Sequence, residues 1–151
     1  MIRVACEAAT DVLWRSPPQV REKLLVRVVN LCNLYRHSKR VDLGPDRLKW
    51  AAPETILSPR EAQHTEATDV YSFGVLLWAL ASDKEPFENV DPASLADLVL
   101  TEQYRLPVPR GTPPAMAKLM DACWRPEADG RPTFATLATE LQQLHRSLLA
   151  E

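Results

Sequence analysis

Apolar residues recur at helical spacing in three stretches of the second half of the chain. After Phe134 they keep to one side, which predicts an amphipathic helix with a single buried stripe. The stretch 69–81 is apolar on more than one side, which predicts a central helix buried on most of its faces. The three sets are Leu137, Ala138, Leu141, Leu144 and Leu148; Val70, Phe73, Leu76, Leu77 and Leu80; and Met116, Leu119, Met120 and Cys123.

Prolines mark where these helices begin. The chain has 13 prolines and four glycines, and proline both fixes φ and removes a backbone donor. Asp91-Pro92 and Thr112-Pro113 each place a capping side chain before a proline at the first helical position. Pro132-Thr133 places a hydroxyl cap before the last apolar run. Three helices are therefore predicted to begin near positions 92, 113 and 134.

Two short runs of apolar residues that include β-branched valines stand apart from the helical pattern. Leu24-Leu25-Val26 and Val28-Val29-Asn30-Leu31 are close together and predict the two strands of a small hairpin. The predicted fold is thus mainly α, a helical bundle with one small β-hairpin.

Composition narrows the class of protein. A chain of 151 residues with 46% hydrophobic and 25% charged residues fits one globular domain. The net charge of −2 gives no reason to expect nucleic acid or an anionic membrane as a partner, and no apolar run is long enough to span a bilayer. Three widely spaced cysteines, Cys6, Cys32 and Cys123, favour free thiols in a reducing compartment over disulfides or a metal site. A cytoplasmic protein is expected.

Four short stretches fall in a fixed order: Lys49-Trp50-Ala51-Ala52-Pro53-Glu54, Asp69-Val70-Tyr71-Ser72-Phe73-Gly74, Cys123-Trp124 and Arg131-Pro132. Their order and spacing resemble the C-terminal lobe of a protein kinase of the tyrosine-kinase or tyrosine-kinase-like type. The resemblance is dense from about Leu48 to Leu144. It implies a kinase-like helical core over 48–151 and a divergent remnant of the early lobe over 1–47, with no N-terminal lobe in this chain.

The resemblance also implies roles for individual residues. Glu54 would close the activation segment and form a buried ion pair with Arg131. Asp69 would begin the central helix and hold the catalytic loop, although the helix dipole alone also favours an aspartate there. Trp124 would be a packing residue, and Trp50 would line a peptide-binding groove. Both tryptophan positions favour the tyrosine side of the family.

The residues that such a lobe would use for phosphoryl transfer are not found at the corresponding positions of this chain. Phosphoryl transfer requires a glycine-rich loop, a strand lysine, a catalytic aspartate and two Mg²⁺ ligands. Counting back from the predicted hairpin places Pro18 at the catalytic aspartate and Lys23 at the metal-binding asparagine. Leu31 falls at the metal-binding aspartate. None of the three side chains can replace the expected one. ATP and Mg²⁺ are expected of the family but not of this chain, and no catalytic, cofactor or metal residue is assigned.

Three functions remain open. In the first, the chain is a non-catalytic pseudokinase module that binds another protein, such as a kinase or a substrate-like peptide. Alternatively, it is a fragment of an active tyrosine-type kinase whose other lobe lies outside this sequence, or a degenerate remnant. The region before Pro17 is too short to supply the early helix of such a lobe. Either residues 1–15 form a substitute helix, or the central helix exposes apolar surface and favours self-association.

Overall fold

A computed structural model describes residues 45–58 and 65–149 of the chain. These residues form helices, and no strand occurs among them, which confirms the prediction of a mainly helical fold. The elements are α3 (Pro45–Leu48), α4 (Pro53–Leu57), α5 (Glu66–Ser82), α6 (Pro92–Leu100), α7 (Pro114–Cys123), the 3₁₀ turn η1 (Ala128–Gly130) and α8 (Phe134–Leu149).

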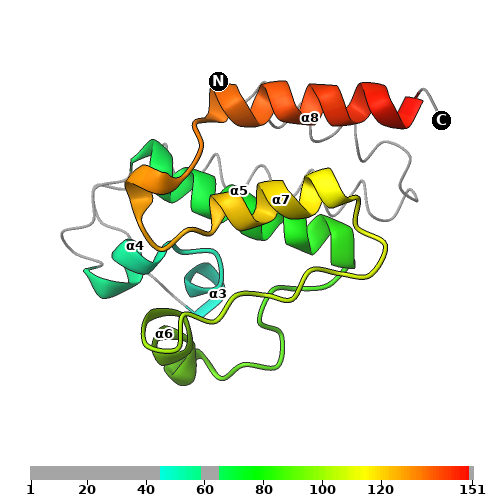
Figure 1. Cartoon of the computed structure of the whole chain (residues 1–151). Coiled ribbons are helices and arrows are strands. Elements are labelled where there is room, and N and C mark those ends of the chain that lie inside the picture. Colours follow the sequence, from blue (N-terminus) through cyan, green and yellow to red (C-terminus); the bar gives the residue numbers. More distant parts are fainter. Residues whose placement is uncertain (1–44, 59–64, 150–151) are drawn as a thin grey trace.

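Helix α5 is the centre of the molecule. In Figure 1 it runs through the middle beside α7, with α8 along one side and α6 at the opposite end near α3 and α4. Its most extensive contact is with α7. The rings of Phe73 on α5 and Phe134 on α8 meet edge to face, with centroids 5.6 Å apart. All the residues of the three predicted stripes are buried except Leu148, whose side chain lies outside the described residues.

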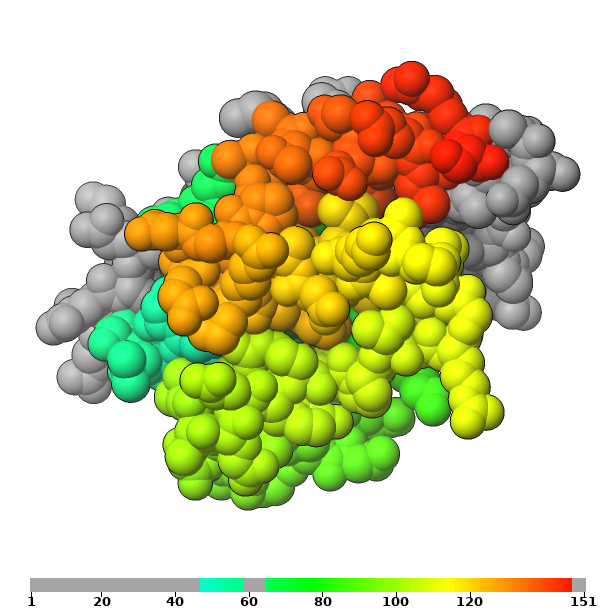
Figure 2. Space-filling model, viewed as in Figure 1, coloured from blue at the N-terminus to red at the C-terminus, as the bar shows by residue number. Residues whose placement is uncertain are grey.

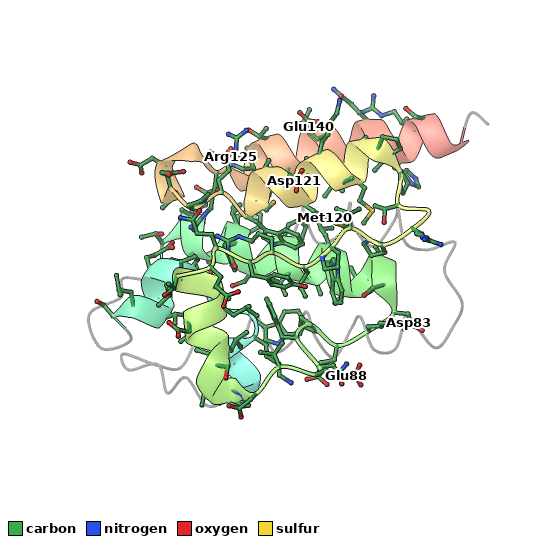
Figure 3. The ribbon with its side chains drawn as sticks, turned by 60° about the horizontal axis from the view of Figure 1, so that its bottom comes forward. Asp83, Glu88, Met120, Asp121, Arg125 and Glu140 are labelled. Atoms are coloured by element: carbon green, nitrogen blue, oxygen red, sulfur yellow. The ribbon has the colours of Figure 1, made fainter. Side chains whose placement is uncertain are left out.

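Figure 3 labels Met120, which is fully buried in the layer that α7 shares with α5, and the exposed Asp121 that follows it. The alternation of a buried and an exposed residue on α7 is what its amphipathic sequence predicts. On α5 the apolar residues from Val70 to Leu80 are also buried. Helices α7 and α8 both pack against α5. The prediction that α5 exposes apolar surface unless residues 1–15 form a substitute helix concerns residues outside the described part of the chain, and it stays a prediction.

The predicted helix starts are close to the observed ones, but two of the three expected caps are wrong. Thr133 caps α8 as predicted, since its hydroxyl accepts the N–H of Thr136 at 3.2 Å. Asp91 makes no side-chain cap, and the N–H of Ser94 donates to its backbone carbonyl at 2.9 Å. Helix α7 begins one residue later than predicted, at Pro114. Its N-cap is therefore Pro113, and Thr112 does not cap it. A residue before a proline is held out of the helical region, and Pro113 accordingly has ψ of 137°.

Helix α5 begins three residues before the predicted central helix. Thr65 and Thr68 form a capping box in which each side chain accepts the other's backbone N–H. The carboxylate of Glu66, in the first turn of α5, accepts the N–H of Phe134 at 2.9 Å and so ties the start of α8 to α5. The predicted hairpin and the early helix fall on residues 1–44, outside the described part of the chain.

Candidate functional site

Arg131 and Glu54 are brought together from positions 77 residues apart. The guanidinium donates to both carboxylate oxygens of Glu54, at 2.7 and 2.9 Å. It also donates to three backbone carbonyls, those of Ala67, Arg125 and Pro126. A guanidinium has five N–H groups, and all five are used here. The pair therefore fastens α4 to the first turn of α5 and to the loop that precedes α8.

The two members of this pair are not equally buried. The Arg131 side chain is 0% exposed, whereas the Glu54 side chain is 37% exposed. Burial acts to raise the pKa of Glu54, but the hydrogen bonds from Arg131 and the nearby positive charge outweigh it, so the pKa lies below the usual value. The pair expected from the resemblance is present, but it is enclosed on the arginine side and open to solvent on the glutamate side.

Two guanidinium groups lie close to the ring of Tyr71 on α5. Arg131 is 5.2 Å and Arg105 is 5.6 Å from the centre of its ring, distances at which a cation is attracted to an aromatic face. Arg105 also donates to the carbonyls of Trp124 and Val99, at the ends of α7 and α6. This residue thereby satisfies the terminal carbonyls of two helices. Neither Tyr71 nor Arg105 was assigned a role from sequence, because no local pattern marks a contact between positions so far apart.

Trp124 follows α7 and packs onto the central helix. It is 4% exposed, and its indole lies directly against Gly74 of α5. A Cβ placed on Gly74 would come within 2.6 Å of the Trp124 Nε1 and of the Cys123 Cβ. Real Cβ atoms essentially never approach that closely, so glycine at position 74 is what allows α7 and α5 to pack at this distance. Trp124 lies in the core, where both the sequence and the resemblance had placed it.

Trp50 is partly buried and packs against the core. Its backbone carbonyl accepts the hydroxyl of Ser72 on α5 at 2.8 Å. The neighbouring Lys49 pairs with Glu85, in the loop after α5, at 2.9 Å. These contacts fix the segment between α3 and α4 against α5. The resemblance predicts that Trp50 lines a peptide-binding groove, and this role stays a prediction.

Of the remaining assigned positions, one lies in the described part of the chain and three lie outside it. Asp69 lies in the first turn of α5, where the helix dipole favours a carboxylate. Pro18, Lys23 and Leu31 fall outside the described residues, and the interpretation of these three positions rests on the sequence. Within 45–58 and 65–149, no group of His, Cys, Asp and Glu side chains could hold a metal ion. In the same part of the chain, none of the helices combines the length and apolar character needed to span a membrane.

Cys123 is a buried free thiol at the end of α7. Burial raises the pKa of this thiol to about 12, against a smaller opposite effect from the positive charge of Arg131. The unfolded thiol ionises near pH 8.5. Above that pH the unfolded state loses its proton first, so any stability linked to the protonated thiol declines as the pH rises toward 12.

We expect Cys123 to resist alkylation in the folded chain. Only the thiolate reacts, and at pH 8 its fraction should be on the order of a thousandfold lower in the folded state than in the unfolded state. The measurement is iodoacetamide labelling of a Cys6→Ser/Cys32→Ser chain at pH 8, with and without guanidinium chloride. Equal labelling rates in the two conditions would contradict the burial of Cys123.

Comparison with known proteins supplies the family. The profile of the family described as protein tyrosine and serine/threonine kinase matches residues 19–141. Serine/threonine-protein kinase CTR1 of Arabidopsis thaliana is 35% identical over 149 residues, which covers 88% of this chain and 18% of that protein. Mitogen-activated protein kinase kinase kinase 10 of Homo sapiens is 36% identical over 100 residues, covering 66% of this chain and 10% of that protein.

A third relative is serine/threonine/tyrosine-protein kinase HT1 of Arabidopsis thaliana, 36% identical over 63% of this chain and 24% of its own length. The chain thus spans about a quarter or less of these relatives. Their names include serine/threonine kinases and no kinase of tyrosine alone, so the preference for the tyrosine side drawn from Trp50 and Cys123-Trp124 finds no support. Trp124 is buried in the core. Since the family profile matches most of the sequence, this chain belongs to the protein tyrosine and serine/threonine kinase family.

Proposed function

We propose that this chain corresponds to the C-terminal lobe of a kinase domain, that it does not transfer phosphate, and that it binds another protein. The observation that carries the proposal is a contrast within one sequence. The positions that hold the lobe together are kept, while the three that would carry the chemistry are occupied by Pro18, Lys23 and Leu31. Proline and leucine have no carboxylate to accept a proton or bind Mg²⁺, and a lysine ammonium repels the metal.

The retained scaffold supports the folding part of the proposal. Arg131 and Glu54 form a bidentate pair, and Gly74 leaves room for Trp124. Each arrangement joins residues far apart in sequence, and each would be lost if a single partner changed. A sequence that no longer needed to fold would not be expected to keep them. This weakens the alternative that the chain is a degenerate remnant.

The second candidate is a fragment of an active kinase. The names of the relatives favour it, since they are protein kinases much longer than this chain. A second lobe elsewhere would supply the glycine-rich loop and the strand lysine. It would not replace the residues at positions 18, 23 and 31, which belong to the C-terminal lobe in the resemblance. We therefore place this candidate second.

The proposal also includes a cellular location and a kind of partner. A reducing, cytoplasmic location fits a buried thiol, Cys123, that is free rather than in a disulfide. The partner is another protein, for which exposed side chains such as Leu57, Tyr104 and Val108 offer apolar contact area. ATP and Mg²⁺ are not part of the proposed function.

We expect no phosphoryl transfer from this chain. The test is incubation with Mg-ATP labelled at the γ-phosphate, with the chain itself and generic serine, threonine and tyrosine acceptors present, followed by measurement of label in protein. A related active kinase serves as the positive control. Label above background that is abolished by mutation of a residue within this chain would reject the proposal and favour the active-fragment alternative.

A further inference from the structure

The turn before α7 carries a hydroxyl, that of Thr112, which does not cap the helix. Residues 109–112 form a β-turn, in which the N–H of Thr112 donates to the carbonyl of Pro109 at 3.3 Å. Gly111, the third residue of the turn, has φ of 84°, in the region that a type II turn requires at that position. The Thr112 hydroxyl donates to the same Pro109 carbonyl at 2.8 Å. These two hydrogen bonds of Thr112 lie within the turn itself.

The tip of this turn projects into solvent. Arg110 and Gly111 are exposed, and Thr112 is partly exposed. A Cβ placed on Gly111 would find no heavy atom within 4 Å. Figure 2 shows the yellow segment that contains the turn at the surface of the molecule. Opening the turn would break the two hydrogen bonds within it and no helix cap. By contrast, Thr65 and Thr133 use their hydroxyls to cap α5 and α8.

The residue after this hydroxyl is a proline. Pro113 directly follows Thr112, and a residue before a proline is held in the extended region. A serine or threonine directly followed by proline is the pattern that proline-directed serine/threonine kinases phosphorylate, and they bind the substrate segment in an extended form. Ser16 and Ser58 share this pattern, but Ser16 and the proline after Ser58 lie outside the described residues. The Thr112-Pro113 pair is therefore the one whose surroundings the structure describes.

We propose that Thr112 is a phosphorylation site for a proline-directed serine/threonine kinase. The Thr112 Oγ1 attacks the γ-phosphorus of Mg-ATP bound to that kinase, and the hydroxyl proton passes to the catalytic base of the same enzyme. The bond between Oγ1 and phosphorus forms while the bond from phosphorus to the β–γ bridging oxygen breaks, and ADP leaves. The phosphate donor is a separate enzyme, so the inference goes beyond the proposed function and makes this chain a substrate.

The phosphate would alter the turn and leave the core in place. A phosphoester oxygen carries no proton, so Thr112 would lose its side-chain hydrogen bond to Pro109 and keep the one from its N–H. The group adds about two negative charges, two residues after the exposed cation of Arg110. It also lies just before α7, where the helix dipole favours an anion. The phosphorylated chain should therefore stay folded.

The experiment incubates the full 151-residue chain with Mg-ATP and each of a panel of purified proline-directed kinases, and maps the phosphate by mass spectrometry. Ser16→Ala and Ser58→Ala are present throughout, so that one serine- or threonine-proline pair remains. A free peptide of residues 105–118 is incubated in parallel. At least one kinase should phosphorylate both the peptide and the folded chain, at Thr112.

Three variants of this chain test the pattern. Pro113→Ala keeps the hydroxyl but removes the proline, and the phosphate on Thr112 should fall to background. Thr112→Ser keeps both features and should still be phosphorylated. Thr101→Ala is the matched control, because Thr101 is an exposed threonine that no proline follows. It should be phosphorylated at Thr112 like the parent chain.

Phosphate on the peptide but not on the folded chain would overturn the inference, because the turn would then not open to a kinase. So would a panel that leaves even the peptide unmodified, or phosphate on Thr112 that Pro113→Ala leaves unchanged. Thermal unfolding shows whether each variant folds. If Pro113→Ala does not, the same change in the peptide, which needs no fold, keeps the test decisive.

A reaction without added kinase separates this inference from the proposed function. Phosphate incorporated in that reaction would come from the chain itself and would reject the proposed function. The inference on Thr112 would then be judged by the increase at Thr112 when the kinase is added. Absent phosphate in both reactions would instead leave the proposed function standing and overturn the inference.

Discussion

Replacing Arg131 with methionine is expected to lower the free energy of unfolding by about 3–5 kcal/mol. Methionine fills much of the same volume but provides no donor. The carboxylate of Glu54 would lose both of its hydrogen bonds, and the carbonyls of Ala67, Arg125 and Pro126 would lose one each. Glu54 is open enough to be hydrated, which reduces its share of the cost. The three carbonyls and the lost contact with the Tyr71 ring add to it.

Thermal unfolding followed by circular dichroism measures this effect, and the midpoint should fall by about 10 °C. Arg131→Lys should lie between methionine and the unmodified chain, because an ammonium keeps the charge but cannot bind a carboxylate in two places. Arg146→Met is the control, since Arg146 is exposed and its removal should change stability by less than about 0.5 kcal/mol. If Arg131→Met and Arg146→Met unfold at the same temperature, the pair does not hold the lobe together.

Replacing Gly74 with alanine is expected to destabilise the fold by about 1–3 kcal/mol, although alanine is the better helix former. In an open helix the same change would stabilise by about 1 kcal/mol. Here the added methyl would meet the Cys123 Cβ and the Trp124 ring at 2.6 Å. Neither atom lies at the end of a flexible side chain, so α7 would have to move away from α5. The sign of the measured change therefore reports the close packing of these two helices.

Gly130→Ala provides the matched comparison in urea unfolding. A Cβ at Gly130 would come no nearer than 3.4 Å to another group, and that group is the flexible side chain of Arg125. Its effect should be within about 0.5 kcal/mol of zero. Destabilisation by Gly74→Ala with no effect from Gly130→Ala is the expected pair of results. Stabilisation by Gly74→Ala would mean that α5 and α7 are further apart than described.

Helix positions could be predicted from sequence because their causes are local. Proline before a helix and apolar residues at helical spacing placed α6 and α8 at their observed starts. The error at α7 was also local, since Pro113 is prevented from being helical by Pro114 after it. The unmade cap at Asp91 has a different cause. Which acceptor receives the Ser94 N–H depends on the tightness of the first turn, and the sequence does not show it.

Contacts between residues far apart in the sequence could be predicted only through the resemblance to protein kinases. Glu54 and Arg131 are 77 positions apart, and no period links them. The stacking of Arg105 and Arg131 on Tyr71 and the capping of α8 by Glu66 had no such guide. A charged residue in a first turn or beside an aromatic is common on any helix surface. Only the folded chain shows which of these side chains reaches across to another element.

The measurement that tests the central claim most directly is thermal unfolding of the purified chain with and without millimolar Mg-ATP. A ligand at about 100 times its dissociation constant adds ~2.7 kcal/mol to stability and should raise the midpoint by several degrees. A chain without a nucleotide site should show one cooperative transition that Mg-ATP leaves unmoved. A clear upward shift would mean that a nucleotide site survives, and that the assignment of Pro18, Lys23 and Leu31 to the catalytic positions is wrong.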